Sequence, residues 1–369
     1  MHVGKTYEKY KCQDLKVDRW EELDIYDEEK GIDDIEDVCD GYEIMEEKSE
    51  EKYLGDILSS DGKNIKNIKA RVAKGKGVIS RIMAMIEGIP FGKNYFKVAL
   101  ILRESLLMSS MLFNSEAWYN VTKTEIELLE TVDVQFLRQV LRAPRSTPKE
   151  MLFLETGCVP FREIIRKKRI LFLQYILNEK DDSLLKKFLM KQKENKKPRD
   201  WINQVLSDLK ELEIEESFET IKSIRKSTLK IMLNDAIKRR AFQDLVIKKE
   251  SHSKVSKIKH ERLEMQQYLK PINVKISIEE AQEMFKMRCR VADVKMNFKG
   301  KYENLDCDIC NEENETQIHL IECKEINKNE REYEKPPEYE ELFKTNIQNQ
   351  LKLVRKFLKN IKIREKMKT

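Results

Sequence analysis

Apolar residues along much of the chain recur every three or four positions, which is the spacing of one face of an α-helix. The clearest run covers residues 63–87, where the apolar positions are Ile65, Ile68, Val72, Ile79, Ile82 and Ile86. Basic residues occupy the opposite face, and two of them, Lys66 and Lys69, are candidate contacts for nucleic acid. Gly88 and Pro90 would end the helix. The pattern predicts a basic amphipathic helix.

Further helices follow from the same periodicity and from capping signals. A largely apolar helix is expected over about 93–119, and Thr122 with Glu125 has the sequence of a capping box. After Pro160, another predicted helix combines apolar positions with a basic flank formed by Arg162, Arg166, Lys167 and Arg169. That flank is compatible with contact to a phosphate backbone and equally with a solvated surface.

The composition supports a mainly α protein. The 369 residues include only 11 Gly and 8 Pro, too few for a loop-rich all-β fold. The sequence contains no uninterrupted apolar run of about 18 residues, so no membrane span is predicted. No apolar stretch that could be a secretory signal follows Met1. We therefore expect an intracellular protein, in the nucleus or the cytoplasm, that is not secreted.

Charge is distributed unevenly along the chain. The net charge is +5, but residues 21–51 contain sixteen Asp or Glu and two Lys, which leaves +19 for the remainder. A basic body is the pattern expected of a protein that binds polyanions, although a solvated helical surface has the same composition. Residues 21–51 are too charged to bury and are expected to form a flexible acidic insertion.

Three of the seven cysteines and one of the four histidines fall within seventeen residues near the C-terminus. The spacing is C-x2-C-x8-H-x3-C, formed by Cys307, Cys310, His319 and Cys323. The first pair can present two thiolates from a tight turn, and the second pair lies one helical turn apart. Four protein ligands leave no position for water, so we expect a structural zinc ion. The alternative is a pair of surface cysteines near an unrelated histidine.

Basic residues precede this motif and also follow it. Those expected to contact nucleic acid are Arg288, Arg290, Lys295, Lys299 and Lys301, because the loop between the ligand pairs carries Glu312, Glu313 and Glu315, which would repel phosphate. Beyond residue 346 a basic amphipathic helix is predicted. It could contact nucleic acid, a protein partner or an acidic membrane surface.

Several short motifs also occur in a characteristic order. They are K-Y-L-G-D-I-L-S-S-D-G-K at 52–63, L-F-N-S-E-A-W-Y at 112–119, I-E-L-L-E-T-V-D at 126–133, P-K-E-M-L-F-L-E-T-G at 148–157, and the C-terminal Cys/His motif. This order resembles the end of the reverse-transcriptase domain of non-LTR (LINE-type) retrotransposons. In that family a Y-L-G segment closes the palm at a hairpin, a helical thumb follows, and a zinc knuckle comes later. The resemblance implies a mainly α, thumb-like helical bundle with a short β-hairpin near residues 53–59 and a small C-terminal zinc knuckle.

The resemblance, together with the charge and helix patterns of residues 21–51 and of the tail, which have no clear counterpart in that family, suggests a division of the chain. We expect a palm-end remnant (1–20), the acidic insertion (21–51), a thumb-like helical domain (52–180), a charged helical connector (181–270), a helix with the knuckle (271–326) and a basic helical tail (327–369). The family's catalytic aspartates lie upstream of the segment that residues 1–5 resemble, so no catalytic residue is expected here.

The expected function is that of a catalytically inactive reverse-transcriptase fragment that binds RNA or DNA with little sequence selectivity. One alternative is a subunit of an RNA-directed DNA polymerase whose palm is supplied by missing sequence or another chain. Others are a protein-interaction scaffold, with the basic C-terminal helix as a possible contact, and a retroelement relic without function.

Overall fold

The computed structural model describes residues 10–12, 42–44, 49–53, 55–87, 94–195, 200–214, 217–270, 275–328 and 346–368. The chain divides into two compact units, residues 1–67 and 68–369, and each is described by itself. Most of the expected palm-end remnant and most of the acidic insertion lie outside the described residues. Among the helices in the described ranges, none is long and apolar enough to cross a membrane.

The first unit contains two antiparallel strand pairs. The paired strands are β1 (Tyr10–Cys12) with β2 (Tyr42–Ile44), and β3 (Glu50–Tyr53) with β4 (Asp56–Ser59). Gly55 lies in the tight connection between β3 and β4 with φ of +91°, a conformation that a side chain would strain. The short hairpin expected near residues 53–59 is confirmed, and its first strand begins at residue 50.

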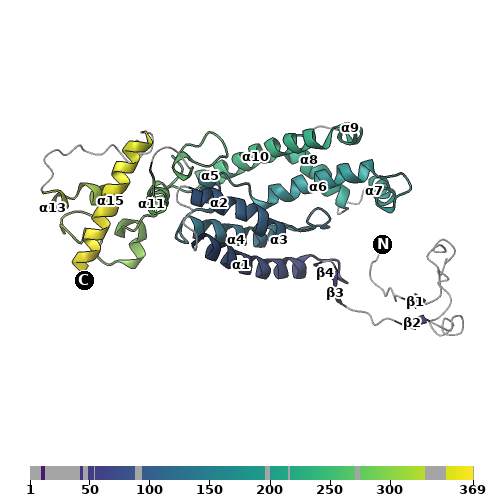
Figure 1. Ribbon diagram of the computed structural model, residues 1–369, viewed down its shortest axis with the longest axis horizontal. Helices are drawn as coiled ribbons and strands as arrows, with labels where there is room; N and C mark the ends of the chain where they lie inside the picture. Colours follow the sequence, from purple (N-terminus) through teal and green to yellow (C-terminus); the bar gives the residue numbers. More distant parts are fainter. Residues whose placement is uncertain are drawn as a thin grey trace. The chain divides into compact units, whose positions relative to one another are not determined.

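The rest of the described chain is mainly helical, as predicted (Figure 1). Up to residue 250 the helices are α1 (Ile65–Glu87), α2 (Tyr95–Leu102), η4 (Arg103–Met108), α3 (Ser109–Met111), α4 (Lys123–Val140), α5 (Lys149–Thr156), α6 (Phe161–Asn178), α7 (Leu184–Asn195), α8 (Trp201–Glu211), α9 (Phe218–Ser223) and α10 (Lys226–Glu250). They are followed by η5 (Gln267–Leu269), α11 (Ile278–Arg288), η6 (Lys295–Lys301), α12 (Gln317–Glu322), α13 (Lys324–Asn327) and α15 (Ile347–Lys368).

Local sequence explains where α4 begins. Thr122 Oγ1 accepts a hydrogen bond from the backbone N–H of Glu125, and the Glu125 carboxylate accepts one from the backbone N–H of Thr122. This reciprocal pair is the predicted capping box. The helix then buries one apolar face, which includes Leu129, Phe136 and Leu137.

The helix predicted over 93–119 ends earlier than expected. Its described part continues through a π-helical turn at residues 103–108 and stops at Met111. Leu112 leaves helical geometry, and Asn114 has a positive φ of 59°, which asparagine tolerates better than most residues. Leu112 and Trp118 are nevertheless buried, so these two side chains pack from turns, whereas Phe113 and Tyr119 are exposed.

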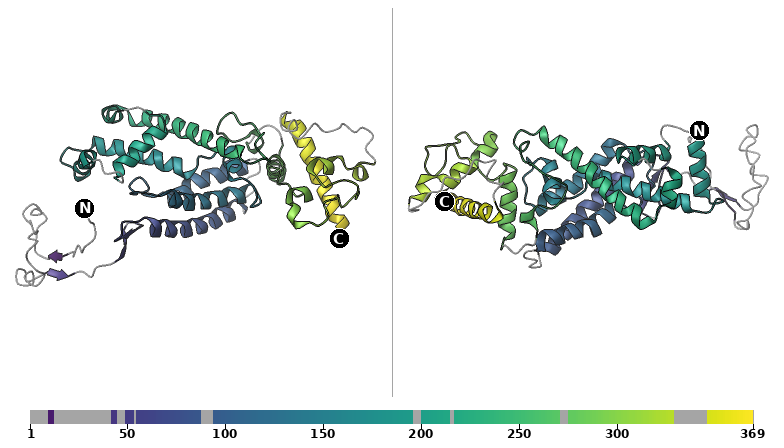
Figure 2. Two further views of the ribbon diagram at one scale, coloured as in Figure 1. Left: turned by 180° about the vertical axis from the view of Figure 1, so that it is seen from behind. Right: turned by 90° about the horizontal axis from the view of Figure 1, so that it is seen from above.

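The second unit contains two clusters of buried apolar side chains. The larger one joins α1, α4 and α5 to α11, α12 and α15. The smaller one lies among α6, α8, α9 and α10. Helix α10 lies beside α6 (Figures 1 and 2), and the two helices are in contact. Near the C-terminus, α15 packs on α11 and α12, with Leu351, Val354 and Phe357 buried.

Candidate metal centre

The four predicted ligands converge on one point. The thiol sulfurs of Cys307, Cys310 and Cys323 and an imidazole nitrogen of His319 all lie within 4.8 Å of one another. Cys310 Sγ and His319 Nε2 lie 3.3 Å apart. Metal–sulfur bonds of about 2.3 Å in a tetrahedron would place thiolates roughly 3.8 Å apart. The cluster therefore has the right size and donor set to hold a metal ion.

Short-range backbone contacts position the ligands. The N–H of Cys307 donates to the carbonyl oxygen of Glu313 at 2.8 Å, which closes the loop that follows the first cysteine pair. Thr316 caps α12 by accepting a hydrogen bond from the N–H of His319 at 2.9 Å. Cys323 follows the last turn of the same helix. The histidine and the last cysteine are thus presented by one short helix.

A carboxylate orients the histidine. His319 Nδ1 lies 3.0 Å from Glu313 Oε2, while Nε2 faces Cys310. Metal-binding histidines commonly donate their second ring N–H to a carboxylate, which fixes the tautomer and makes the ligand nitrogen more basic. The sequence predicts Glu313 only as a charge that repels phosphate, but its carboxylate also contacts the candidate ligand His319.

A second acidic residue of the same loop is buried. Glu315 is 0% exposed, and its Oε1 accepts hydrogen bonds from Arg364 at 2.7 Å and from the backbone N–H of Lys295 at 3.1 Å. Arg364 belongs to α15, so the carboxylate joins the ligand loop to the C-terminal helix. Glu315 therefore does not present a repelling charge at the surface, which corrects the sequence-based expectation.

The thiol environment differs among the three cysteines. Burial raises the pKa of Cys323 to about 12 and also raises the pKa of Cys307, and the nearby charge of Cys310 adds to both shifts. Burial acts in the same direction on Cys310, but backbone N–H groups of Glu312 and Glu313 outweigh it and lower its pKa. The thiolate is the form that binds a metal. A bound cation and the ionised ligands would therefore stabilise each other.

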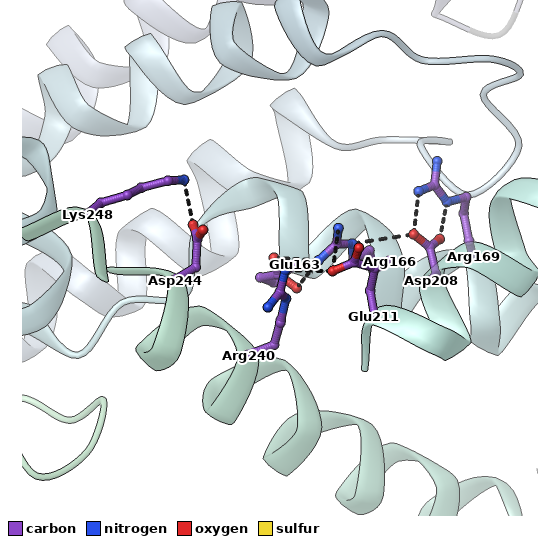
Figure 3. A network of polar contacts seen from close by, with 8 residues as sticks. All are labelled: Glu163, Arg166, Arg169, Asp208, Glu211, Arg240, Asp244 and Lys248. Atoms are coloured by element: carbon purple, nitrogen blue, oxygen red, sulfur yellow. Dashed lines mark hydrogen bonds and ion pairs between the residues drawn. The ribbon is translucent and has the colours of Figure 1, made fainter. Parts of the chain in front are cut away.

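Two arginines predicted to contact nucleic acid instead hold α6 against α8 (Figure 3). Arg169 is 6% exposed and donates two hydrogen bonds to Asp208, at 2.7 and 2.9 Å. Arg166 pairs with Glu163 at 2.9 Å and lies 3.4 Å from Asp208. Because these guanidinium groups are committed to carboxylates inside the fold, the prediction for Arg166 and Arg169 is corrected.

Two more of the predicted contacts are also buried. Arg288 donates to both carboxylate oxygens of Glu155 at 3.0 Å. Lys295 donates from Nζ to the carbonyl oxygen of Asp306 at 2.7 Å and pairs with Asp308 at 2.5 Å. Both basic side chains are 7% exposed. Arg288 thereby joins α11 to α5, and Lys295 holds the segment that carries Cys307, so the assignment of both residues to a nucleic-acid surface is corrected as well.

The remaining predicted contacts are more accessible. Lys69, Lys299 and Lys301 are exposed, as is Lys66, which pairs with Glu50 within the first unit. The half-buried members of the set are Arg162, Lys167 and Arg290. These residues belong to α1, α6, the turn after α11 and η6, and nucleic-acid contact stays a prediction for them.

Comparisons of the chain with protein-family models, with curated proteins and with solved structures found no match. Its function is therefore inferred from the chain's own residues. Two features carry that inference, namely the Cys/His cluster and the distribution of exposed positive charge.

Proposed function

We propose that this chain binds nucleic acid and that Cys307, Cys310, His319 and Cys323 hold one structural zinc ion. The observation that carries the proposal is the exposed face of α1. Between Ile65 and Ile86 this helix has no acidic residue, and its exposed cations include Lys69, Lys74, Lys76 and Arg81. Within the described chain these four cations have no ion-pair partner.

The four cations border a strip of small side chains. At 3.6 residues per turn, Lys69 and Lys76 lie on one side of the exposed face, and Lys74 and Arg81 lie on the other. The strip between them is exposed and consists of Ala70, Ala73, Gly77, Ser80 and Ala84. Small residues let a phosphodiester backbone approach the helix closely, while cations on both sides can reach its phosphates. The face extends about 18 Å from Lys69 to Arg81, enough for several successive phosphates.

The donor set supports zinc as the metal. Three thiolates and one imidazole in a tetrahedral arrangement are typical of structural zinc sites and leave no coordination position for a substrate or water. The carboxylate of Glu313 would hold the histidine in the required tautomer. Zinc would thereby fix the loop between α11 and α15 without taking part in a reaction.

Nucleic-acid binding is tested by fluorescence anisotropy of the full chain with a labelled single-stranded RNA of about 20 nucleotides over a salt series. For a single-stranded nucleic acid, the slope of the logarithm of the binding constant against the logarithm of the salt concentration becomes shallower by about 0.7 for each phosphate contact removed. The variant Lys69→Gln/Lys74→Gln/Lys76→Gln should therefore have a slope shallower by about 2. The control Lys97→Gln/Lys187→Gln/Lys191→Gln removes the same charge from exposed positions on α2 and α7. Equal changes in the two variants, or no binding by the parent chain, would contradict the proposal.

Zinc is tested separately, by elemental analysis of the purified chain. We expect one zinc per chain, lost in Cys307→Ser/Cys310→Ser and retained in Cys158→Ala/Cys289→Ala, whose cysteines are buried outside the cluster. A zinc-free parent chain purified from zinc-supplemented cells would refute the metal assignment. It would leave the α1 face as an independent hypothesis.

We further propose that the chain corresponds to the thumb and knuckle region of a non-LTR reverse transcriptase. The support is the motif order in the sequence, in which the K-Y-L-G-D-I-L-S segment spans the β3–β4 hairpin. Polymerisation would require carboxylates supplied from outside this chain. Sequencing the upstream coding region tests the proposal, and a region without an aromatic-x-Asp-Asp motif would argue against it.

A further inference from the structure

Helices α6 and α10 lie side by side (Figures 1 and 2). A second group of cations lies at their contact. Lys167 of α6 donates a hydrogen bond from Nζ to Asn234 Oδ1 of α10 at 2.6 Å. Lys230 and Lys238 lie one turn before and one turn after Asn234, and both are exposed. Residues four apart share one side of a helix, so the hydrogen bond holds Lys167 beside the two lysines of α10.

No carboxylate neutralises this group through a salt bridge within the described residues. Other cations of α6 differ in this respect, since Lys168 pairs with Glu116 at 2.6 Å and Arg169 pairs with Asp208. Burial lowers the pKa of Lys167, and Lys230 and Lys238 lower it further, while Glu104 acts in the opposite direction. Like charges held close together repel, and a bound anion would relieve that repulsion.

We propose that Lys167, Lys230 and Lys238 form an anion-binding row that takes the phosphodiester backbone of a nucleic-acid strand. The helical rise separates Lys230 from Lys238 by about 12 Å, with Lys167 held near the midpoint through Asn234. A linear series of cations suits a chain of phosphates better than one compact anion, which could reach only part of the row. The Asn234 amide nitrogen adds a neutral donor of a kind that often contacts phosphates.

This inference rests on the proposed nucleic-acid binding and adds a contact separate from the α1 face. The row contacts the backbone alone, so it should contribute affinity without sequence preference. It also assigns a function to two residues of α10 that the sequence pattern did not single out. In the sequence, Lys230 and Lys238 are marked only by lying four positions before and after Asn234. This spacing indicates a shared site only when the structure places Lys167 of α6 beside Asn234.

The test is the same anisotropy titration with Lys230→Gln/Lys238→Gln, both of which are surface positions whose replacement leaves the core intact. Removing two contacts should reduce the salt slope by about 1.4. Adding Lys167→Gln should reduce it by about 0.7 more. The matched control is Lys187→Gln/Lys191→Gln, which removes the same charge from the exposed surface of α7. Circular dichroism and thermal unfolding of each variant confirm that it is folded.

The outcomes separate this inference from the proposed function. A shallower slope for the α10 variant, with a smaller effect in the control, supports the row. A parent chain that binds RNA while the α10 variant keeps its slope overturns the row and leaves the proposed function standing. Equal effects in the α10 variant and the control show a general effect of net charge and also overturn it. Absence of RNA binding by the parent chain overturns both.

Discussion

Replacing Glu155 with glutamine is expected to lower the free energy of unfolding by about 3–5 kcal/mol. Glu155 lies near the end of α5, is 0% exposed, and accepts hydrogen bonds from Arg288 at 3.0 Å and from the Tyr268 hydroxyl at 2.7 Å. His260 Nε2 lies 2.9 Å from the same carboxylate. Glutamine keeps the size of the side chain but leaves the Arg288 guanidinium buried without its counter-charge. The large loss in the free energy of unfolding comes from this buried and unpaired positive charge.

The same carboxylate predicts a pH dependence of stability. Burial disfavours the ionised form of Glu155, but Arg288 and His260 outweigh burial and lower its pKa from 4.5 to about 2. Because the pKa is lower in the folded chain than in the unfolded chain, the stabilisation is complete above pH 4.5 and is lost as the pH falls towards 2. At 1.36 kcal/mol per unit, this shift corresponds to about 3 kcal/mol, in agreement with the lower end of the mutational range.

Urea unfolding followed by far-ultraviolet circular dichroism measures both effects, at about pH 7 and at about pH 3. The free energy of unfolding of the parent chain should fall at the lower pH. The difference in this free energy between the parent chain and Glu155→Gln should become smaller. The variant Glu155→Leu/Arg288→Met removes both charges and should cost less than Glu155→Gln alone, because no buried charge is stranded. A loss below about 1 kcal/mol for Glu155→Gln at neutral pH would refute the argument, since the buried pair should cost several times more to break.

Further predictions concern four single substitutions in the second unit, each measured by urea unfolding. Asp133→Asn should cost about 3–5 kcal/mol, because it strands the buried guanidinium of Arg103, which contacts Asp133 at 2.6 and 2.5 Å. Gly77→Ala should stabilise the chain by about 0.5–1 kcal/mol, because a Cβ at this position on the open face of α1 would meet no other atom within 4 Å. Gly157→Ala should destabilise the chain, because its φ is +71° and its Cβ would lie 2.3 Å from the backbone nitrogen of Met265. Thr122→Ala should cost about 1 kcal/mol by removing the capping box of α4, and Thr131→Ala on the exposed face of the same helix serves as the control.

The sequence predicted those parts of the fold that depend on residues close together in the chain. The apolar stripe of α1 and the capping box of α4 depend on residues within one or two helical turns, so periodicity and side-chain chemistry are sufficient to find them. The segment at 112–119 is as apolar as a helix, but Phe113 and Trp118 face Arg71 of α1, whose guanidinium lies 5.7 and 5.4 Å from their rings. A contact with another helix therefore takes the place of the helical continuation that local pattern favours.

Several residues of the predicted basic surface pair with carboxylates that are remote in sequence, although Arg166 also pairs with Glu163 only three positions away. Arg169 finds Asp208 across 39 positions, and Arg288 finds Glu155 across 133. Helical spacing shows only which side of its own helix a cation occupies, and it says nothing about an acidic residue that another helix brings to that side. The Cys/His cluster was easier to predict because its four donors fall within seventeen residues and can meet through local turns.

The C-terminal helix α15 reduces how far the Cys/His loop would depend on a metal ion for its stability. The ligand loop alone is too short to bury a core, so the sequence predicts a module that depends on zinc. In the structure, however, α15 buries Leu351, Val354 and Phe357 against α11 and α12, and Asn360 donates to the carbonyl oxygen of Leu320 at 2.7 Å. The apolar face of α15 is therefore covered by its own chain, which argues against that face docking on a membrane or a partner helix. The exposed side of α15 includes Arg355 and Lys362, which lie 2.6 Å from Glu280 and 3.8 Å from Glu279 of α11, so part of its positive charge is neutralised within the chain.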